Sequence, residues 1–218
     1  MMTADVTPAP RGKWRKFALQ ALLGALLGAG FSVGVNEMVD SGVLGTFSAA
    51  QEAAAFVAML YGVIGLLVGF GTALPRAGAT MLNVEDEEEL REQRRMLAWS
   101  AGSMVLMGAL LALLALAGPG GMVPPGPALA FYAAGWLVLA GASVVVLRNM
   151  DELMRALTRE TGELAYYLVL TVCGGWAVLA WLGYVPAMGM LPFITMNHGL
   201  LLLASFIAAA RRGMIMPR

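Results

Sequence analysis

The chain has 218 residues, of which 59% are hydrophobic and only 13% are charged, about half the charged fraction of an ordinary soluble domain. This composition excludes a water-soluble domain of that length, whose surface would need more charge, and favours helices that face lipid. The net charge of zero provides no overall attraction for nucleic acid, which we therefore exclude as a partner.

The first residues of the chain combine a short polar tail with a basic stretch. Residues 1–10 include Pro8 and Pro10, and we expect them to form a disordered tail. Four basic residues follow between positions 11 and 16, which gives the outline of a signal peptide. The next apolar run is too long for a signal peptide and is not closed by a small-x-small cleavage site, so we predict an uncleaved first helix.

Six apolar segments follow the basic stretch. Each has about 20 residues, enough to cross the hydrocarbon core of a bilayer at a rise of about 1.5 Å per residue. The sequence therefore predicts an all-α, six-helix transmembrane bundle that forms a single domain over residues 11–218. The predicted helices lie near residues 17–36, 53–74, 96–118, 128–147, 164–185 and 191–210.

Lysine and arginine occupy alternate connections between these segments. They occur within residues 11–16, 76–95, 148–159 and 211–218, and the three other loops contain none. By the positive-inside rule these four stretches are cytoplasmic, so both termini are predicted in the cytoplasm and the number of spans is even. Arginine outnumbers lysine, and alanine and glycine are abundant, a bias associated with bacteria. We therefore expect a bacterial inner-membrane protein.

The second half of the chain contains signs of an internal repeat. A shift of 64 residues aligns residues 87–150 with residues 151–214 and produces twelve identities. The matches between charged residues are the informative ones in so apolar a sequence. Each copy would hold two helices, with the copies related by an axis along the membrane normal. We predict a repeat of helical hairpins, although six apolar helices with hairpin-like spacing could arise without duplication.

Two charged stretches precede the third and fifth predicted helices. Asn83 with Asp86, and Asn149 with Glu152, have the spacing of a helix N-cap and an acid three residues later. Both helices should therefore start in the cytoplasm, either as solvated extensions or as surfaces for a membrane-protein partner. The candidate partner-binding residues are Glu87, Glu88, Arg91, Arg95, Asp151, Glu152, Arg155 and Arg159.

Glycines in the first two predicted helices form GxxxG pairs, whose missing side chains let helix backbones approach closely. They could pack the first hairpin, form a homo-oligomer contact or line a pore. The helix-packing candidates are Gly24, Gly28, Gly30, Gly34, Gly62, Gly65 and Gly69.

Other polar residues give little sign of chemistry. Glu37, Asp40, Glu52 and His198 are assigned near the outer face, but one histidine without metal-ligand spacing favours loop polarity or capping over a metal site. Cys173 is the one cysteine, which excludes an internal disulfide, argues against a thiolate metal cluster and suggests a small buried residue. We expect no catalytic residue, metal or cofactor.

These observations favour a non-enzymatic accessory or scaffold subunit, which should have a filled helix core and an exposed charged surface. The alternative is a small channel or facilitator for an uncharged or small solute, and a membrane enzyme is a third hypothesis. An enzyme should bring two titratable groups into one pocket. A facilitator should have a polar-lined cavity that includes some of Gln20, Tyr61, Thr171 and Asn197.

Overall fold

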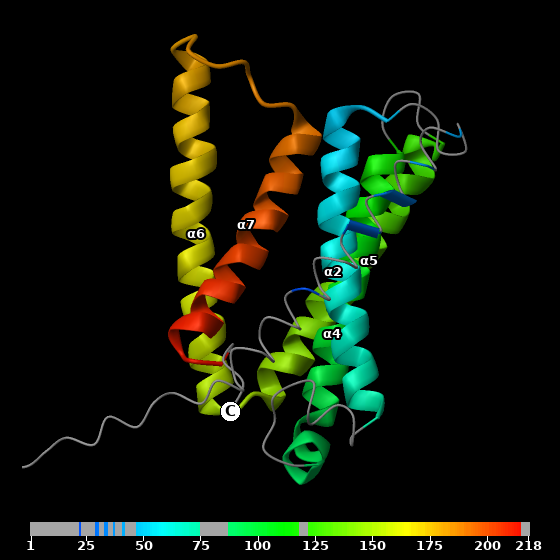
Figure 1. Ribbon diagram of the computed structural model, residues 1–218, viewed down its shortest axis with the longest axis vertical. Helices are drawn as coiled ribbons and strands as arrows, with labels where there is room; N and C mark the ends of the chain where they lie inside the picture. The colour runs from blue at the N-terminus through cyan, green and yellow to red at the C-terminus, as the bar shows by residue number, and fades with distance from the viewer. Residues whose placement is uncertain are drawn as a thin grey trace, which may run out of the picture.

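A computed structural model of the protein describes residues 22, 29–30, 33–34, 37, 41, 47–74, 87–117 and 122–214, and of residues 87–92 only the helical backbone. Five long helices form this part of the chain, which contains no strand (Figure 1). They are α2 (Ala49–Ala73), α4 (Glu87–Leu116), α5 (Pro125–Asn149), α6 (Glu152–Trp181) and α7 (Met190–Arg211).

All five helices are long and apolar enough to cross a membrane. The prediction of an all-helical, multi-pass membrane protein is confirmed at this level. The predicted tail, 1–10, and most of the first predicted helix, 17–36, lie outside the described residues. A sixth span and a single domain over residues 11–218 therefore remain predictions.

Local sequence explains where the helices begin. The Ser48 side chain accepts a hydrogen bond from the Gln51 backbone N–H, and the Gln51 side chain accepts one from the Ser48 backbone N–H. This capping box starts α2 four residues before the predicted apolar segment. Both α4 and α6 contain 30 residues and run without a break from a charged stretch into an apolar one, as expected.

The N-cap predicted for α6 is wrong. Asp151, rather than Asn149, accepts a hydrogen bond of 2.7 Å from the backbone N–H of Met154. Asn149 belongs to the last turn of α5, where its side chain donates to the Val145 carbonyl. The cap lies two residues later because α5 continues through Asn149 before the backbone becomes extended. The other predicted cap, Asn83 with Asp86, lies outside the described residues.

The helices alternate in direction and form two similar hairpins. Helix α6 begins 65 residues after α4 (152 − 87), and α7 begins 65 residues after α5 (190 − 125). This spacing differs by one residue from the shift of 64 that aligns the sequence, a difference within the uncertainty of helix ends. Duplication of one hairpin remains a prediction.

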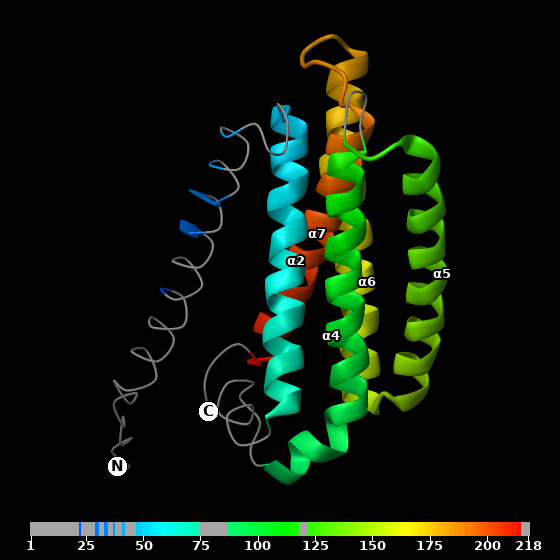
Figure 2. The same cartoon turned by 90° about the vertical axis from the view of Figure 1, so that its right-hand side faces the viewer.

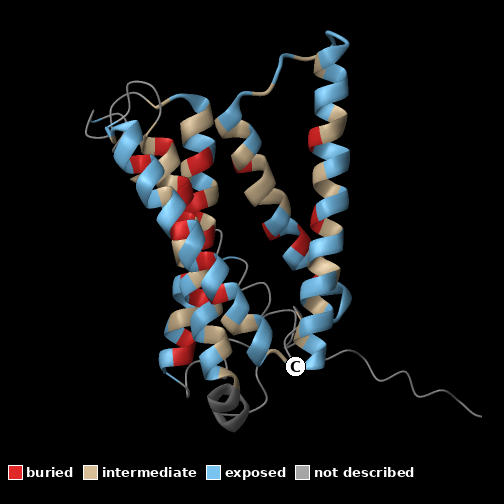
Figure 3. Cartoon of the chain, turned by 180° about the vertical axis from the view of Figure 1, so that it is seen from behind, coloured by how far each residue is buried: buried red, intermediate tan, exposed pale blue. Residues whose placement is uncertain are grey.

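The packing order in space is α5, α4, α2, α7 and α6, with each helix contacting the next; Figure 2 shows α5, α4 and α2 side by side, and Figure 1 shows α2, α7 and α6. The core lies between α2 and α4, where Ala54 and Ala58 pack against Leu111 and Ala115. Buried residues occur on α2, α4, α7 and the facing side of α5, whereas α6 is mostly exposed (Figure 3). Helix α7 therefore joins α6 to the rest of the bundle.

Candidate functional site

The described arginines gather at one end of the bundle, which we call the arginine end. It is formed by the first turns of α4 and α6 and the last turns of α5 and α7, at the bottom of Figure 1. We call the opposite end, where α4 and α6 end, the outer end, after the side of the membrane on which the sequence predicts it. The arginine end carries Arg94, Arg95, Arg148, Arg155, Arg159, Arg211 and Arg212.

An ion pair closes the α6–α7 hairpin at the arginine end. Glu160 Oε2 lies 2.9 Å from Arg212 Nε, and Glu160 Oε1 lies 4.0 Å from Arg211 Nη1. The groups are partly exposed, so the pair contributes at most about 1 kcal/mol. We did not predict this contact. The sequence feature that could have indicated it is the Arg211–Arg212 pair, which ends α7, the helix that runs antiparallel to the helix of Glu160.

The predicted partner-binding residues divide between two helices. On α6, Glu152, Arg155 and Arg159 are exposed. Arg155 donates to the Met150 carbonyl at 3.4 Å, rather than pairing with the Asp151 cap four residues before it. On α4, Arg95 is exposed; the side chains of the other three candidates, at positions 87, 88 and 91, lie outside the described residues.

Helices α2 and α4 meet at two glycines. A Cβ added at Gly65 would lie 2.8 Å from the Ala101 carbonyl oxygen, and one at Gly108 would lie 2.5 Å from the Ala58 carbonyl oxygen. Neither site has room for a side chain, so the two backbones approach as closely as glycine allows. We did not predict Gly108. Its spacing of seven residues from both Ala101 and Ala115 forms a line of small residues on one face of α4, and this pattern could have indicated a close helix contact.

The other predicted packing glycines have more space. A Cβ at Gly62, Gly30 or Gly34 would meet nothing within 4 Å, and one at Gly69 would make an ordinary contact of 3.7 Å with Ala101. Gly24 and Gly28 lie outside the described residues. Within the described chain, Gly65 is the predicted glycine that the fold brings closest to another helix.

Helices α2 and α7 are joined by a polar contact within the apolar bundle. The buried Tyr61 hydroxyl donates to the His198 carbonyl at 2.9 Å, and the two rings meet edge to face at 6.1 Å. His198 Nδ1 lies 2.8 Å from the Ile194 carbonyl, a geometry that places the proton on Nδ1. The contact fills the space between the helices and leaves the Tyr61 hydroxyl satisfied.

The described polar residues that were expected along a solute path donate hydrogen bonds to backbone carbonyls. The Thr171 hydroxyl donates to the Tyr167 carbonyl, and the Asn197 amide donates to the Phe193 carbonyl, each within its own helix. Gln20 lies outside the described residues. Together with the Tyr61 contact, these bonds leave three of the four predicted path residues engaged by the fold.

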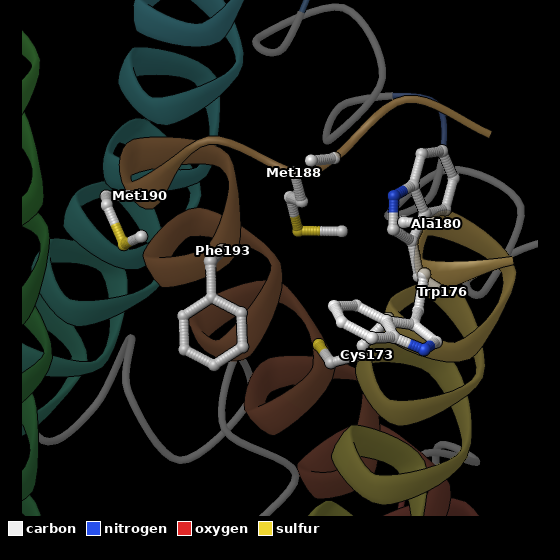
Figure 4. Close-up of a pocket in the computed structure, with 9 residues that line it drawn as sticks. Cys173, Trp176, Ala180, Met188, Met190 and Phe193 are labelled. Atoms are coloured by element: carbon white, nitrogen blue, oxygen red, sulfur yellow. The ribbon is translucent and has the colours of Figure 1, made fainter. Parts of the chain in front are cut away.

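Apolar cavities lie along the described helices. Two of about 1090 and 360 Å³ run between α2 and α4, and one of about 460 Å³ lies between α6 and α7 at the outer end (Figure 4). Arg94 lines the largest of them and Cys173 lines the outer one. None of the three joins two of the titratable groups that an enzyme would require.

The acidic residues assigned to the outer face do not assemble with His198. No group of three or more His, Cys, Asp or Glu side chains that could hold a metal occurs among the described residues. Glu37 and Glu52 are exposed, whereas His198 lies in α7 against Tyr61. Asp40 lies outside the described residues.

Comparison with models of known protein families, with curated proteins and with solved structures finds no match to this chain. Two features of the molecule bear on its function. These are the exposed charges of the arginine end and the contacts that join α2 to α7 through Tyr61 and α2 to α4 at Gly65 and Gly108.

Proposed function

We propose that the protein is a non-enzymatic accessory or scaffold subunit of a membrane assembly. The observation that carries this proposal is the exposed first part of α6, residues 152–163, which is about 18 Å long at the helical rise. It holds Glu152, Arg155 and Arg159 on exposed positions, and the apolar Leu153 beside them is 51% exposed. A surface that combines charged groups with exposed apolar side chains is typical of a protein-binding surface rather than of one that faces only solvent.

The contacts between the helices support a scaffold over a facilitator. A facilitator needs polar groups that remain available along a cavity. Tyr61, Thr171 and Asn197 each instead donate one side-chain hydrogen bond to a backbone carbonyl. The cavities between α2 and α4, and between α6 and α7, are lined mainly by apolar side chains.

A co-purification experiment tests the partner. The protein, tagged at its own chromosomal locus, is purified in mild detergent and analysed by mass spectrometry. We expect a stoichiometric membrane protein to accompany the wild type. Its yield should fall at least about tenfold in Arg155→Glu, because like charges placed together at an interface cost several kcal/mol and each 1.4 kcal/mol is a factor of about ten. Arg148→Glu is the matched control, since Arg148 is an exposed arginine at the same end but on α5.

The two alternative outcomes lead in different directions. Equal recovery of the partner with wild type and Arg155→Glu would show that the partner does not bind the exposed surface of α6. A small oligomer without any partner would contradict the scaffold itself, and flux measurements in liposomes would then test the facilitator.

We also propose that the arginine end faces the cytoplasm of a bacterium, with six spans and both termini inside. The support is the one-sided distribution of arginine, and the matched lengths of α4 and α6 favour a duplicated hairpin. In a Cys173→Ser background, an impermeant maleimide should label Met122→Cys at the outer end in intact cells. Thr3→Cys and Ala156→Cys should react only after lysis. If Thr3→Cys and Met122→Cys were both labelled in intact cells while Ala156→Cys stayed protected, an even number of spans would be refuted.

A further inference from the structure

The cavity of about 1090 Å³ between α2 and α4 is a groove that reaches the arginine end; we call it the α2–α4 groove. Its volume is at the upper limit for small-molecule sites in proteins. The lining residues of α4 run from Arg94 to Ala109, and those of α2 run from Val63 to Ala73. The groove therefore follows the two helices and suits a long ligand that lies along their axes.

The two walls of the α2–α4 groove differ in the size of their side chains. On α2, Leu66 and Phe70 line the groove and are 64% and 60% exposed. On α4, the lining includes the small residues Ala98 and Gly102, and a Cβ added at Gly102 would meet nothing within 4 Å. A flexible hydrocarbon chain can therefore lie over the small residues of α4 and against the large side chains of α2.

The length of the groove matches one leaflet of a bilayer. From Ala98 to Ala109, both of which line the groove, α4 advances about 17 Å at the helical rise, and half of a hydrocarbon core is about 15 Å thick. Trp99, at the start of this stretch, is 42% exposed, as is typical of an aromatic side chain at the membrane interface. The apolar part of the groove therefore extends over the depth of the acyl chains in the leaflet at the arginine end.

Arg94 supplies the charge at the end of the groove. It is exposed, lines the groove and precedes Ala98 by about 6 Å along α4, on the water side of Trp99. Within the part of the chain that the structure describes, Arg94 forms no ion pair or hydrogen bond. A guanidinium at this depth can donate two parallel hydrogen bonds to a phosphate group.

We propose that the α2–α4 groove binds one anionic phospholipid, with its phosphate on Arg94 and one acyl chain along the groove. Basic pockets between transmembrane helices bind anionic headgroups in this way. Beyond Arg94, the polar side chain among the described lining residues is Thr72, whose hydroxyl donates to the Gly69 carbonyl at 2.7 Å. The rest of the groove thus presents apolar surface, which suits a hydrocarbon chain. This inference does not depend on the proposed scaffold function, because the exposed surface of α6 takes no part in it.

The first test is native mass spectrometry of the purified full chain in detergent, titrated with phosphatidylglycerol or with phosphatidylcholine of the same acyl chains. We expect the first phosphatidylglycerol to bind about fivefold more tightly, because about 1 kcal/mol per basic side chain corresponds to that factor. Arg94→Gln should abolish this preference. Arg148→Gln is the matched control and should retain it, because Arg148 is an exposed arginine at the same end that does not line the groove.

A second pair of variants tests the acyl chain. Gly102→Leu places a side chain in the groove, and should weaken phosphatidylglycerol binding by a factor comparable with that of Arg94→Gln. Gly141→Leu is its control, because a Cβ there also meets nothing within 4 Å but Gly141 lies on α5 outside the groove. Inorganic phosphate should not displace the lipid, since it has no chain to occupy the groove.

Four results would overturn the proposal. The first is equal affinity of the wild type for the two lipids, and the second is an unchanged affinity for phosphatidylglycerol in Arg94→Gln or Gly102→Leu, with both variants monodisperse on size-exclusion chromatography. Displacement by inorganic phosphate would indicate an anion site without a lipid. A lipid-free Gly102→Leu protein that unfolds far below Gly141→Leu would show that protein fills the groove, either the first predicted helix, 17–36, or a second copy of the chain.

Discussion

Gly108→Ala is expected to destabilise the protein by about 1 to 3 kcal/mol, the cost typical of overpacking a filled interface. The added methyl group would lie 2.5 Å from the Ala58 carbonyl oxygen and 3.1 Å from the Gly62 backbone nitrogen. Both neighbours are backbone atoms and cannot rotate away, so α2 and α4 must separate. Gly102→Ala, on the same helix, meets nothing within 4 Å and should be neutral or stabilising by up to about 1 kcal/mol.

The same comparison can be made on α2. Gly65→Ala places a methyl group 2.8 Å from the Ala101 carbonyl oxygen, whereas Gly62→Ala places one in open space. Midpoints of thermal unfolding in detergent measure all four variants. We expect Gly65 and Gly108 variants to fall below wild type and the two controls to match or exceed it. Equal midpoints within each pair would show that the helices are not in close contact at these glycines.

The helical spans were predictable because length and hydropathy alone define them. Lipid and protein interior are both apolar, so the face of a transmembrane helix that packs against its neighbours carries little periodic signal. Small residues are the exception. Gly65 was identified from its spacing, but the sequence did not show that its neighbour would be Ala101 of α4.

Contacts between distant helices could not be predicted in the same way. The bonds from Tyr61 to the His198 carbonyl and from Arg212 to Glu160 depend on which helices are neighbours. Helix order is set by many weak packing contacts, none of which has a sequence motif. The outer-end cavity follows the same rule: Cys173 was expected to be a small buried residue, and its approach to Met196 requires the register of the α6–α7 hairpin.

The corrected N-cap illustrates a third limit, the end of a helix. Asn149 and Asp151 are both good N-cap residues, and the sequence around them permits either. The choice depends on how far α5 continues, and α5 packs against α4 before it ends at Asn149. Packing of the preceding helix therefore determines which of two suitable side chains caps the next.

Tyr61→Ala is expected to cost about 3 to 5 kcal/mol, the range for removing a buried aromatic side chain. Tyr61 is 4% exposed and lies on α2 where α7 crosses it. Helix α7 contacts α2 far more than α4, and α6 packs on α7. Loss of the ring leaves a cavity at this junction, so the α6–α7 pair should become less tightly held to the other helices and the unfolding midpoint should fall.

Two further variants separate the ring from its hydroxyl group and from general effects of aromatic loss. Tyr61→Phe keeps the ring but removes the hydrogen bond to the His198 carbonyl, and should cost only about 0.5 to 1.5 kcal/mol. Phe70→Ala removes an aromatic ring from the same helix at a position that is 60% exposed, where lipid or detergent replaces it, and should have a small effect. The expected order of unfolding midpoints is therefore Phe70→Ala and Tyr61→Phe above Tyr61→Ala. If Tyr61→Ala unfolds at the same temperature as Phe70→Ala, the ring does not hold α2 and α7 together, and the α6–α7 pair must be attached through other contacts.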